Sequence, residues 1–308
     1  MPTRVLAPVF VLLWSSGYVV GALAIDVTGP VPLMFTRFAL ASVACAPLAL
    51  RGGRWRGAPV GRLAVIGLLL QVTQFGGAYS AFALGLPAGL SALVMLGLSP
   101  LVTTALAIAG GQETGDRRLW TGLVVGLAGV VVGLIPELGS AHLGAGVALA
   151  LVGMLGLAGG SLLQRRWSAG VDPTVSAAVQ QVSATVVMAP VLVIVGGRFD
   201  LGVQLIASVG WLGWGMGIGA LVALVTLLAR MDASRVGAML LLVPAVTALA
   251  SAPALGEPLH PLTFVGMAIA AAGVGTVLRR ATPAQPRSTL IANTCPTQPS
   301  LTSNAPAR

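Results

Sequence analysis

The sequence predicts an all-α polytopic membrane protein whose ten transmembrane helices form two inverted five-helix repeats. Three observations support this prediction: the apolar composition, the placement of the arginines and an internal repeat. The 308-residue chain is 56% hydrophobic and only 8% charged, with a mean hydropathy of +0.95. Soluble domains carry about 25% charged residues. Since so few polar groups could not cover a surface in water, an ordinary soluble enzyme is excluded.

The apolar runs have the length of membrane helices. A helical span needs about 20 apolar residues, whereas a strand of a membrane barrel needs about ten residues of alternating polarity. The runs here do not alternate, and short loops with Gly, Pro or Arg separate them. They predict ten spans, at 7–25, 33–50, 62–85, 89–109, 118–135, 143–163, 174–195, 204–229, 234–255 and 261–278.

The two ends of the chain differ in composition. Arg4 followed by an apolar run also suits a cleavable signal peptide, but Trp14 and Tyr18 interrupt this long run and favour a first membrane span. Residues 281–308 are rich in Pro, Ser, Thr, Asn and Gln and show no apolar period. We expect them to form a disordered cytoplasmic tail.

The arginines predict the topology, because cytoplasmic loops of membrane proteins are enriched in positive charge. All 17 basic residues are arginine. With the N-terminus inside and ten alternating spans, every arginine except Arg198 and Arg37 lies in a cytoplasmic segment or at the cytoplasmic end of a span. We therefore expect a multi-pass protein of the plasma or inner membrane with both termini in the cytoplasm. Nucleic-acid binding is not expected, because the basic residues lie between apolar spans.

The two halves of the chain repeat at an offset of 144 residues. Pro100 corresponds to Pro244, and Glu113 to Glu257. Further matches are Met95-Leu96 with Met239-Leu240, Val102-Thr103 with Val246-Thr247, Gly122 with Gly266 and Ala128-Gly129 with Ala272-Gly273. Five spans in each copy make the second copy inverted, an arrangement typical of transporters. We expect repeats at 1–139 and 140–280.

These residues resemble the EamA family of the drug/metabolite transporter superfamily. The resemblance rests on the stretch 88–100, on Gly110-Gly-Gln-Glu113 and on the glycines of 120–129, together with their second copies. Leu13-Trp14-Ser15-Ser16 and Thr36-Arg37-Phe38 also fit the first two spans of the family. The resemblance covers nearly the whole chain except the tail. It implies a ten-helix carrier that exports metabolites or amino acids.

Polar residues inside the apolar spans are the candidate substrate-binding residues. Apart from Arg62, Arg118 and Arg235 at the very starts of their spans, Arg37 is the charged residue within a predicted span, where a charge is costly and commonly functional. Because it lies near a helix end, snorkelling to the lipid headgroups is the alternative. Its repeat partner is Gln181. The other candidates are Trp14, Ser15, Tyr18, Gln71, Gln74, Gln180 and Trp214.

Each of these candidates also has a structural interpretation. Gln71 and Gln74 share a helix face, and their amides could equally join two helices. Trp214 could belong to an interfacial aromatic belt. Pro100 and Pro244 should act as kinks or hinges. Gly122, Gly126, Gly129 and Gly133 form a ridge that favours close helix packing, either within the fold or in a homodimer.

A secondary carrier for a small solute, working by alternating access, is the function that these features favour. A membrane scaffold or sensor without a pathway is the alternative, and an enzyme is not expected because acid–base and nucleophile–base pairs are missing. We expect no metal and no cofactor; the expected partners are the lipid bilayer and a small-molecule substrate. The spans hold no acidic residue, so we expect a neutral, zwitterionic or anionic substrate and not a lipophilic cation.

Overall fold

The computed structural model confirms the all-helical class. It describes residues 3–50, 55–86, 91–111, 115–138, 144–200, 202–255 and 261–278. Within these ranges the elements are helices, and the extended pairing is a single antiparallel bridge between Thr28 and Phe199. Seven helices are long and apolar enough to cross a membrane, and Val94–Ala109 and Phe264–Val277 are shorter apolar helices. The total of ten spans remains a prediction, and the expected tail lies outside the described residues.

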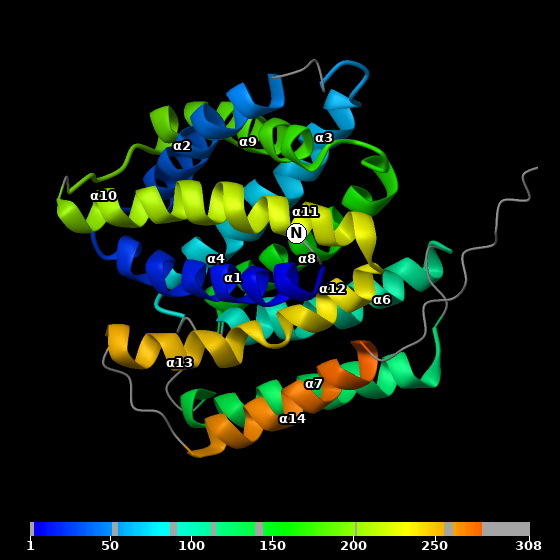
Figure 1. The fold of residues 1–308 in the computed structure, drawn as a ribbon. Helices are drawn as coiled ribbons and strands as arrows, with labels where there is room; N and C mark the ends of the chain where they lie inside the picture. Colours follow the sequence, from blue (N-terminus) through cyan, green and yellow to red (C-terminus); the bar gives the residue numbers. More distant parts are fainter. Residues whose placement is uncertain are drawn as a thin grey trace, which may run out of the picture.

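The helices follow one another in the same order in both halves of the chain (Figure 1). Three segments labelled η are π-helical. The first half contains α1 (Thr3–Ile25), α2 (Pro30–Leu50), α3 (Val60–Gly67), η2 (Leu68–Thr73), α4 (Gln74–Ala83), η3 (Leu93–Gly97), α6 (Leu98–Ala109) and α7 (Arg117–Leu138). The second half contains α8 (Ala145–Trp167), α9 (Pro173–Val195), α10 (Val203–Gly210), η4 (Trp211–Ala220), α11 (Leu221–Arg230), α12 (Ala233–Leu240), α13 (Val243–Leu255) and α14 (Pro261–Leu278).

Local signals explain where several helices begin and end. Asp172 caps α9 by accepting a hydrogen bond from the backbone N of Thr174 at 2.8 Å, and Pro173 occupies the first turn. Asp116 accepts from the backbone N of Leu119 at 2.7 Å at the start of α7. At the other end of α9, Gly196 adopts a φ of 70°, which favours glycine. Caps of this kind satisfy backbone groups that a helix end leaves unpaired.

The two halves interlock. In the first half, α1 packs on η4 and α13, and in the second half the equivalent helix α8 packs on η2, α4 and α6. The equivalent helices α2 and α9 also pack on each other, and a 3.0 Å contact joins the hydroxyls of Ser42 and Thr185 between them. The core is therefore built from side chains of both halves, and neither half buries its apolar helix faces alone.

Helices α7 and α14 form a close pair at one edge of the molecule (Figure 1). A Cβ atom built on Gly129 would overlap the backbone N of Ala270, and one built on Gly266 would overlap the backbone of Gly133. The two backbones touch because glycine has no side chain. The predicted glycine ridge thus packs within the fold, and at these positions it is not free to form a dimer contact.

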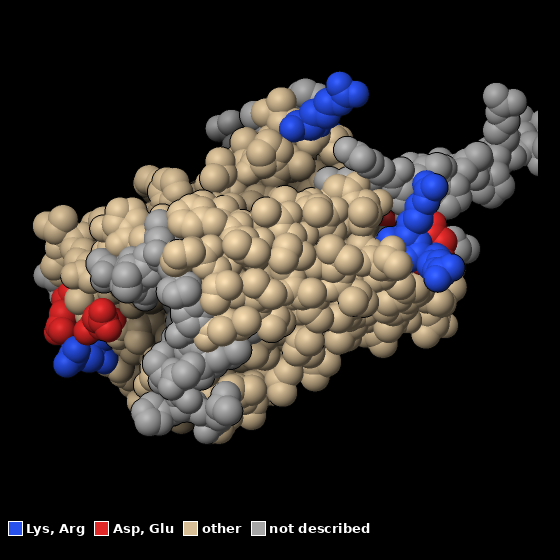
Figure 2. All heavy atoms as spheres, turned by 90° about the horizontal axis from the view of Figure 1, so that it is seen from below, with Lys and Arg blue, Asp and Glu red and all other residues tan. Residues whose placement is uncertain are grey.

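The outer surface has the character expected of a protein in a bilayer. Figure 2 shows acidic and basic atoms at two opposite ends of one face, with further basic atoms on a projection and a broad uncharged area between the ends. Large apolar side chains point outward from the helices: Val193 is 84% exposed and Ile194 is 82% exposed. A water-soluble monomer rarely exposes so much apolar surface, so these side chains fit contact with lipid.

Replacing Gly129 by Ala should lower stability by about 1–3 kcal/mol, because the added methyl group forces two helix backbones apart. The measurement is the thermal midpoint of detergent-purified protein, followed by size-exclusion chromatography after heating. Gly275→Ala is the matched control, since a Cβ at this α14 position meets no atom within 4 Å. Equal midpoints for the two variants would show that the α7–α14 contact is not tight.

Candidate transport site

Two equivalent helices become irregular at equivalent positions. The π-helical segment η2 spans 68–73, and the offset of 144 carries it to 212–217, which lies inside the π-helical segment η4. Glycine-rich sequence explains η4, where four of the ten residues are glycine. Gln71 lies within η2, and Gln74 follows it directly. Because π-helical turns occur frequently at functional sites, this region is a candidate site.

The two proline-containing helices are irregular as well. The π-helical segment η3 precedes Pro100, and a break at Leu241–Leu242 separates α12 from α13 just before Pro244. Proline has no N–H to donate to the carbonyl four residues earlier, so an unbroken helix is disfavoured there. A π-helical turn therefore precedes Pro100 and a helix break precedes Pro244, although the sequence predicted two continuous spans; that the two prolines act as kinks or hinges remains a prediction.

Arg37 is buried among aromatic rings. Its side chain is 1% exposed, and its guanidinium carbon lies 4.0 Å from the ring centroid of Phe75, 5.2 Å from that of Phe38 and 5.6 Å from that of Tyr79. The Nη1 group donates a hydrogen bond to the hydroxyl of Tyr79. Its Nε atom is buried without a partner among the described residues. The side chain therefore points into the protein and does not snorkel to the surface.

The energetics of this arrangement are unfavourable unless another partner exists. An arginine at the centre of a bilayer costs about 2.5–3.5 kcal/mol on insertion scales and more in simulations. A cation–π contact contributes about 0.5–2 kcal/mol, and a hydrogen bond to a charged group about 1.5–3 kcal/mol. The rings and Tyr79 offset a large part of the cost of burying the charge. They do not satisfy Nε, because an aromatic ring is a poor substitute for a hydrogen-bond acceptor.

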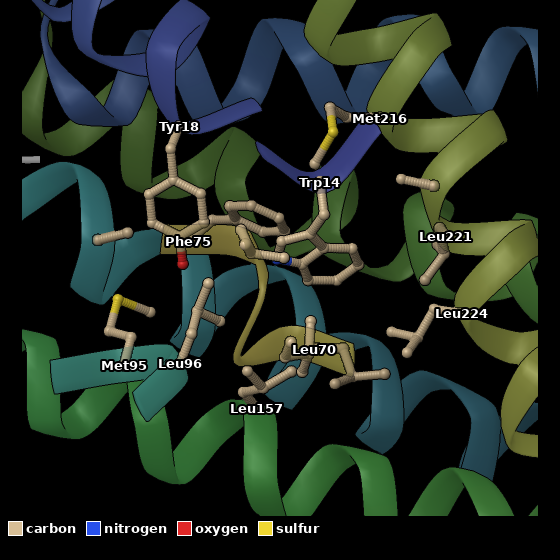
Figure 3. Packing of buried hydrophobic residues seen from close by; sticks show 14 of the residues in the cluster. Trp14, Tyr18, Leu70, Phe75, Met95, Leu96, Leu157, Met216, Leu221 and Leu224 are labelled. Atoms are coloured by element: carbon tan, nitrogen blue, oxygen red, sulfur yellow. The ribbon is translucent and has the colours of Figure 1, made fainter. Parts of the chain in front are cut away.

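Other polar atoms nearby in the fold also lack partners. Among the described residues, the indole Nε1 of Trp14 and both side-chain polar atoms of Gln74 are buried and unpaired. The ring centroids of Trp14 and Phe75 are 6.4 Å apart. Figure 3 shows Trp14, Tyr18 and Phe75 together, surrounded by apolar side chains from both halves, including Leu157 and Met216. Native proteins pair nearly all buried polar groups, so unpaired atoms in this region suggest that a ligand binds there.

The remaining glutamines are better satisfied. Gln180 donates to Oε1 of Gln164 at 2.7 Å and to Oγ of Ser176 at 3.0 Å, in a buried network between α8 and α9. Gln181 donates to the carbonyl of Gly217, inside η4, at 2.9 Å. Each of the two residues keeps one buried oxygen without a partner among the described residues. Helix joining therefore explains most of the polar groups of Gln180 and Gln181.

The remaining candidate residues differ in how deeply their side chains are buried. Ser15 is 1% exposed, and its Oγ lies 2.8 Å from the carbonyl of Val11 and 3.3 Å from that of Val243. Ser15 therefore contacts α13, the helix that follows the break at Leu241–Leu242. Gln71 is 3% exposed and Tyr18 4% exposed. Trp214 is 57% exposed, so it faces outward as an aromatic belt residue would and lies apart from the buried cluster.

Sequence reasoning missed the aromatic residues that enclose Arg37. Phe75 and Tyr79 are four residues apart on α4 and follow Gln71 at the same spacing. That spacing would have placed them on one helix face with a candidate residue. It could not have shown that α2 presents Arg37 to the same face, because this depends on how α2 and α4 pack.

Two loops meet at one end of the molecule. The hydroxyl of Thr28 donates to the carbonyl of Arg198 at 2.8 Å, and the backbone N of Asp200 donates to the carbonyl of Val27 at 3.3 Å. Thr28 and Phe199 also form the antiparallel bridge. We call these contacts between 27–28 and 198–200 the loop clasp. The loop clasp joins the α1–α2 connection of the first half to the α9–α10 connection of the second half.

Comparison with known proteins agrees with this architecture. A model of the EamA-like transporter family matches residues 3–135 and again residues 144–279. The chain belongs to the EamA-like transporter family. The double match confirms the two repeats, and the family is one of membrane transporters rather than enzymes. Together with the apolar helices, it establishes this EamA-like chain as a multi-pass membrane protein.

A solved structure shares the fold. It is described only as "Crystal structure of protein" and superposes with a TM-score of 0.72 at 20% sequence identity. The alignment covers 89% of this chain and 95% of that chain. At this identity the likeness concerns the fold alone. Among curated proteins, no sequence matches this EamA-like chain.

Replacing Gln74 by Leu should abolish transport while leaving thermal stability unchanged or higher. The change removes two buried polar atoms that have no partner among the described residues, so the folded state loses no described hydrogen bond. Gln164→Leu is the matched control: it removes the partner of Ser176 and Gln180 and should lower stability by about 1–3 kcal/mol. If Gln74→Leu destabilised the protein as much as Gln164→Leu, Gln74 would be structural.

Proposed function

We propose that this EamA-like protein is a secondary carrier that exports a small metabolite or an amino-acid-like solute by alternating access. The observation that supports this proposal is the set of buried, unpaired polar atoms of Trp14, Arg37 and Gln74 within apolar helices. A membrane scaffold has little need for such groups, because each costs free energy unless something binds it. A bound solute would supply the missing partners.

The arrangement of the halves supports alternating access. Both halves contribute to the buried cluster, and their irregular segments lie at equivalent positions. Such irregular helices give two packed halves places to bend as one rocks against the other. The loop clasp ties the two halves at one end, which we assign to the outer side. We propose that the clasp keeps that side closed above Arg37, which lies about 10 Å along α2 from Pro30 at the helix rise of about 1.5 Å per residue.

We propose ten spans in the plasma or inner membrane, with both termini in the cytoplasm. In a background without Cys45 and Cys295, cysteines at Ala169 and Val203 should react with a membrane-impermeant maleimide from opposite sides. The exposed position 169 lies in the loop between α8 and α9 and should be cytoplasmic, whereas Val203 should be external. Labelling of both from one side would contradict the topology and the inversion.

Transport itself can be tested in proteoliposomes. Vesicles are loaded with a mixture of amino acids and small organic acids, and the retained solutes are measured by mass spectrometry. We expect at least one solute to leave faster than from protein-free vesicles. If every solute were retained equally with and without the protein, the carrier proposal would fail for these classes.

A disulfide across the loop clasp should stop this efflux. Thr28 and Phe199 form an antiparallel bridge, and paired strand residues lie about 4.5–5.5 Å apart between Cα atoms, within the range of a disulfide. The double variant Thr28→Cys/Phe199→Cys should transport when it is reduced. When it is oxidised, its transport rate should fall about tenfold, because the outer side cannot open. The two single variants are the controls. Unchanged efflux across a fully formed disulfide would show that the clasp is not a gate.

A further inference from the structure

We propose that Arg37 is an anion-binding residue and that the solute carried by this protein bears a carboxylate group that pairs with its guanidinium. The inference rests on the proposed transport function and narrows it to a substrate class. It also gives a role to an arginine that is costly to keep in a membrane helix.

The surroundings of Arg37 are neutral. Its recorded contacts are the rings of Phe38, Phe75 and Tyr79 and the hydroxyl of Tyr79. The acids whose side chains the structure describes lie in loops or at helix ends: Asp26, Asp116, Asp172, Asp200 and Asp232. None of these is recorded in an ion pair with Arg37. The positive charge therefore lacks a negative partner among the described residues.

The geometry of the guanidinium favours a carboxylate. Arginine presents a planar fork of N–H donors that matches the two oxygens of a carboxylate. Tyr79 takes one donor from Nη1, and Nε stays available. Arg37 is the buried arginine of the described helices, so one positive charge is present to balance the ligand. A singly charged carboxylate matches this charge, whereas a phosphate dianion would need a second cation.

Tyr79 and Phe75 prepare the site in different ways. Tyr79 is 2% exposed, and its hydroxyl accepts the hydrogen bond from Nη1, which fixes the direction of the guanidinium. Phe75 stacks against the guanidinium face, and its ring centroid lies 5.8 Å from that of Tyr79. The edge that carries Nε is the part left unpaired. Tyr79 is therefore a positioning residue, and the surrounding rings would pack against an apolar body of the solute.

The test measures binding to the purified, detergent-solubilised protein by calorimetry, using compounds that differ only in the carboxyl group. The pairs are isovalerate with isovaleramide, phenylacetate with phenylacetamide, leucine with leucinamide and phenylalanine with phenylalaninamide. We expect at least one acid to bind the wild-type protein about tenfold or more tightly than its amide. Sodium chloride serves as the control for a site that takes any small anion.

Variants at two positions separate binding from folding. Arg37→Gln should bind acids and amides equally, because the charge is gone, and Arg37→Lys should keep part of the preference for acids. Tyr79→Phe keeps the ring and removes the hydroxyl, so it should reduce the acid-to-amide ratio without changing amide binding. Elution in size-exclusion chromatography checks that each variant is folded. Because the wild-type comparison needs no variant, a variant that fails to fold does not decide the outcome.

The outcomes separate this inference from the transport function. Equal binding of acids and amides, no binding of any acid, or an Arg37→Gln variant that still prefers acids would each overturn the inference. Chloride that displaces the acids at equal concentration would also overturn it, since the site would then recognise charge alone. If in any of these cases the proteoliposomes still released a solute, the carrier function would stand without a carboxylate site. If acids bound and no solute moved, the anion site would stand and the carrier function would fail.

Discussion

Polar groups inside a bilayer must find partners within the protein, because hydrocarbon neither donates nor accepts hydrogen bonds. The described helices obey this constraint almost everywhere. The hydroxyls of Ser42 and Thr185 bond to helix carbonyls, and Gln164, Ser176 and Gln180 form hydrogen bonds with one another. Buried side-chain polar atoms without a partner among the described residues remain at Trp14, Arg37, Gln74, Thr104, Gln180, Gln181 and Thr247. For Trp14, Arg37 and Gln74 we propose that a transported solute supplies the missing partners.

Close packing and irregular helices have separate places in this fold. At α7 and α14 the glycines bring two backbones into contact and form a rigid edge. In contrast, η2, η3, η4 and the break before Pro244 interrupt the helices that surround the buried cluster. A carrier needs both properties, since a rigid body transmits movement and an irregular helix absorbs it. The repeat places the irregular segments at equivalent positions, so each half can respond in the same way.

Arg37 shows how the membrane environment and the aromatic side chains act together. The same guanidinium in water would be solvated and would bind a carboxylate weakly, because water screens charges and competes for hydrogen bonds. Burial by Phe38, Phe75 and Tyr79 removes that competition. The rings stabilise the cation enough for it to stay in the helix, and they cannot neutralise it. The proposed anion site would therefore be stable when empty and would still favour an anion.

The sequence by itself determined the class, the order of the helices and the two repeats, and it placed Arg37 and Gln74 as polar residues within apolar helices. Those inferences needed only hydropathy, charge and period along the chain, because a bilayer sorts segments by properties that each segment carries alone. Tertiary structure decided the rest. It brought Phe75 and Tyr79 to Arg37, turned Trp214 outward, directed the glycine ridge toward α14 and joined Thr28 to Phe199. Such contacts join residues from different helices, so they depend on the shapes of facing helix surfaces, which no single segment contains.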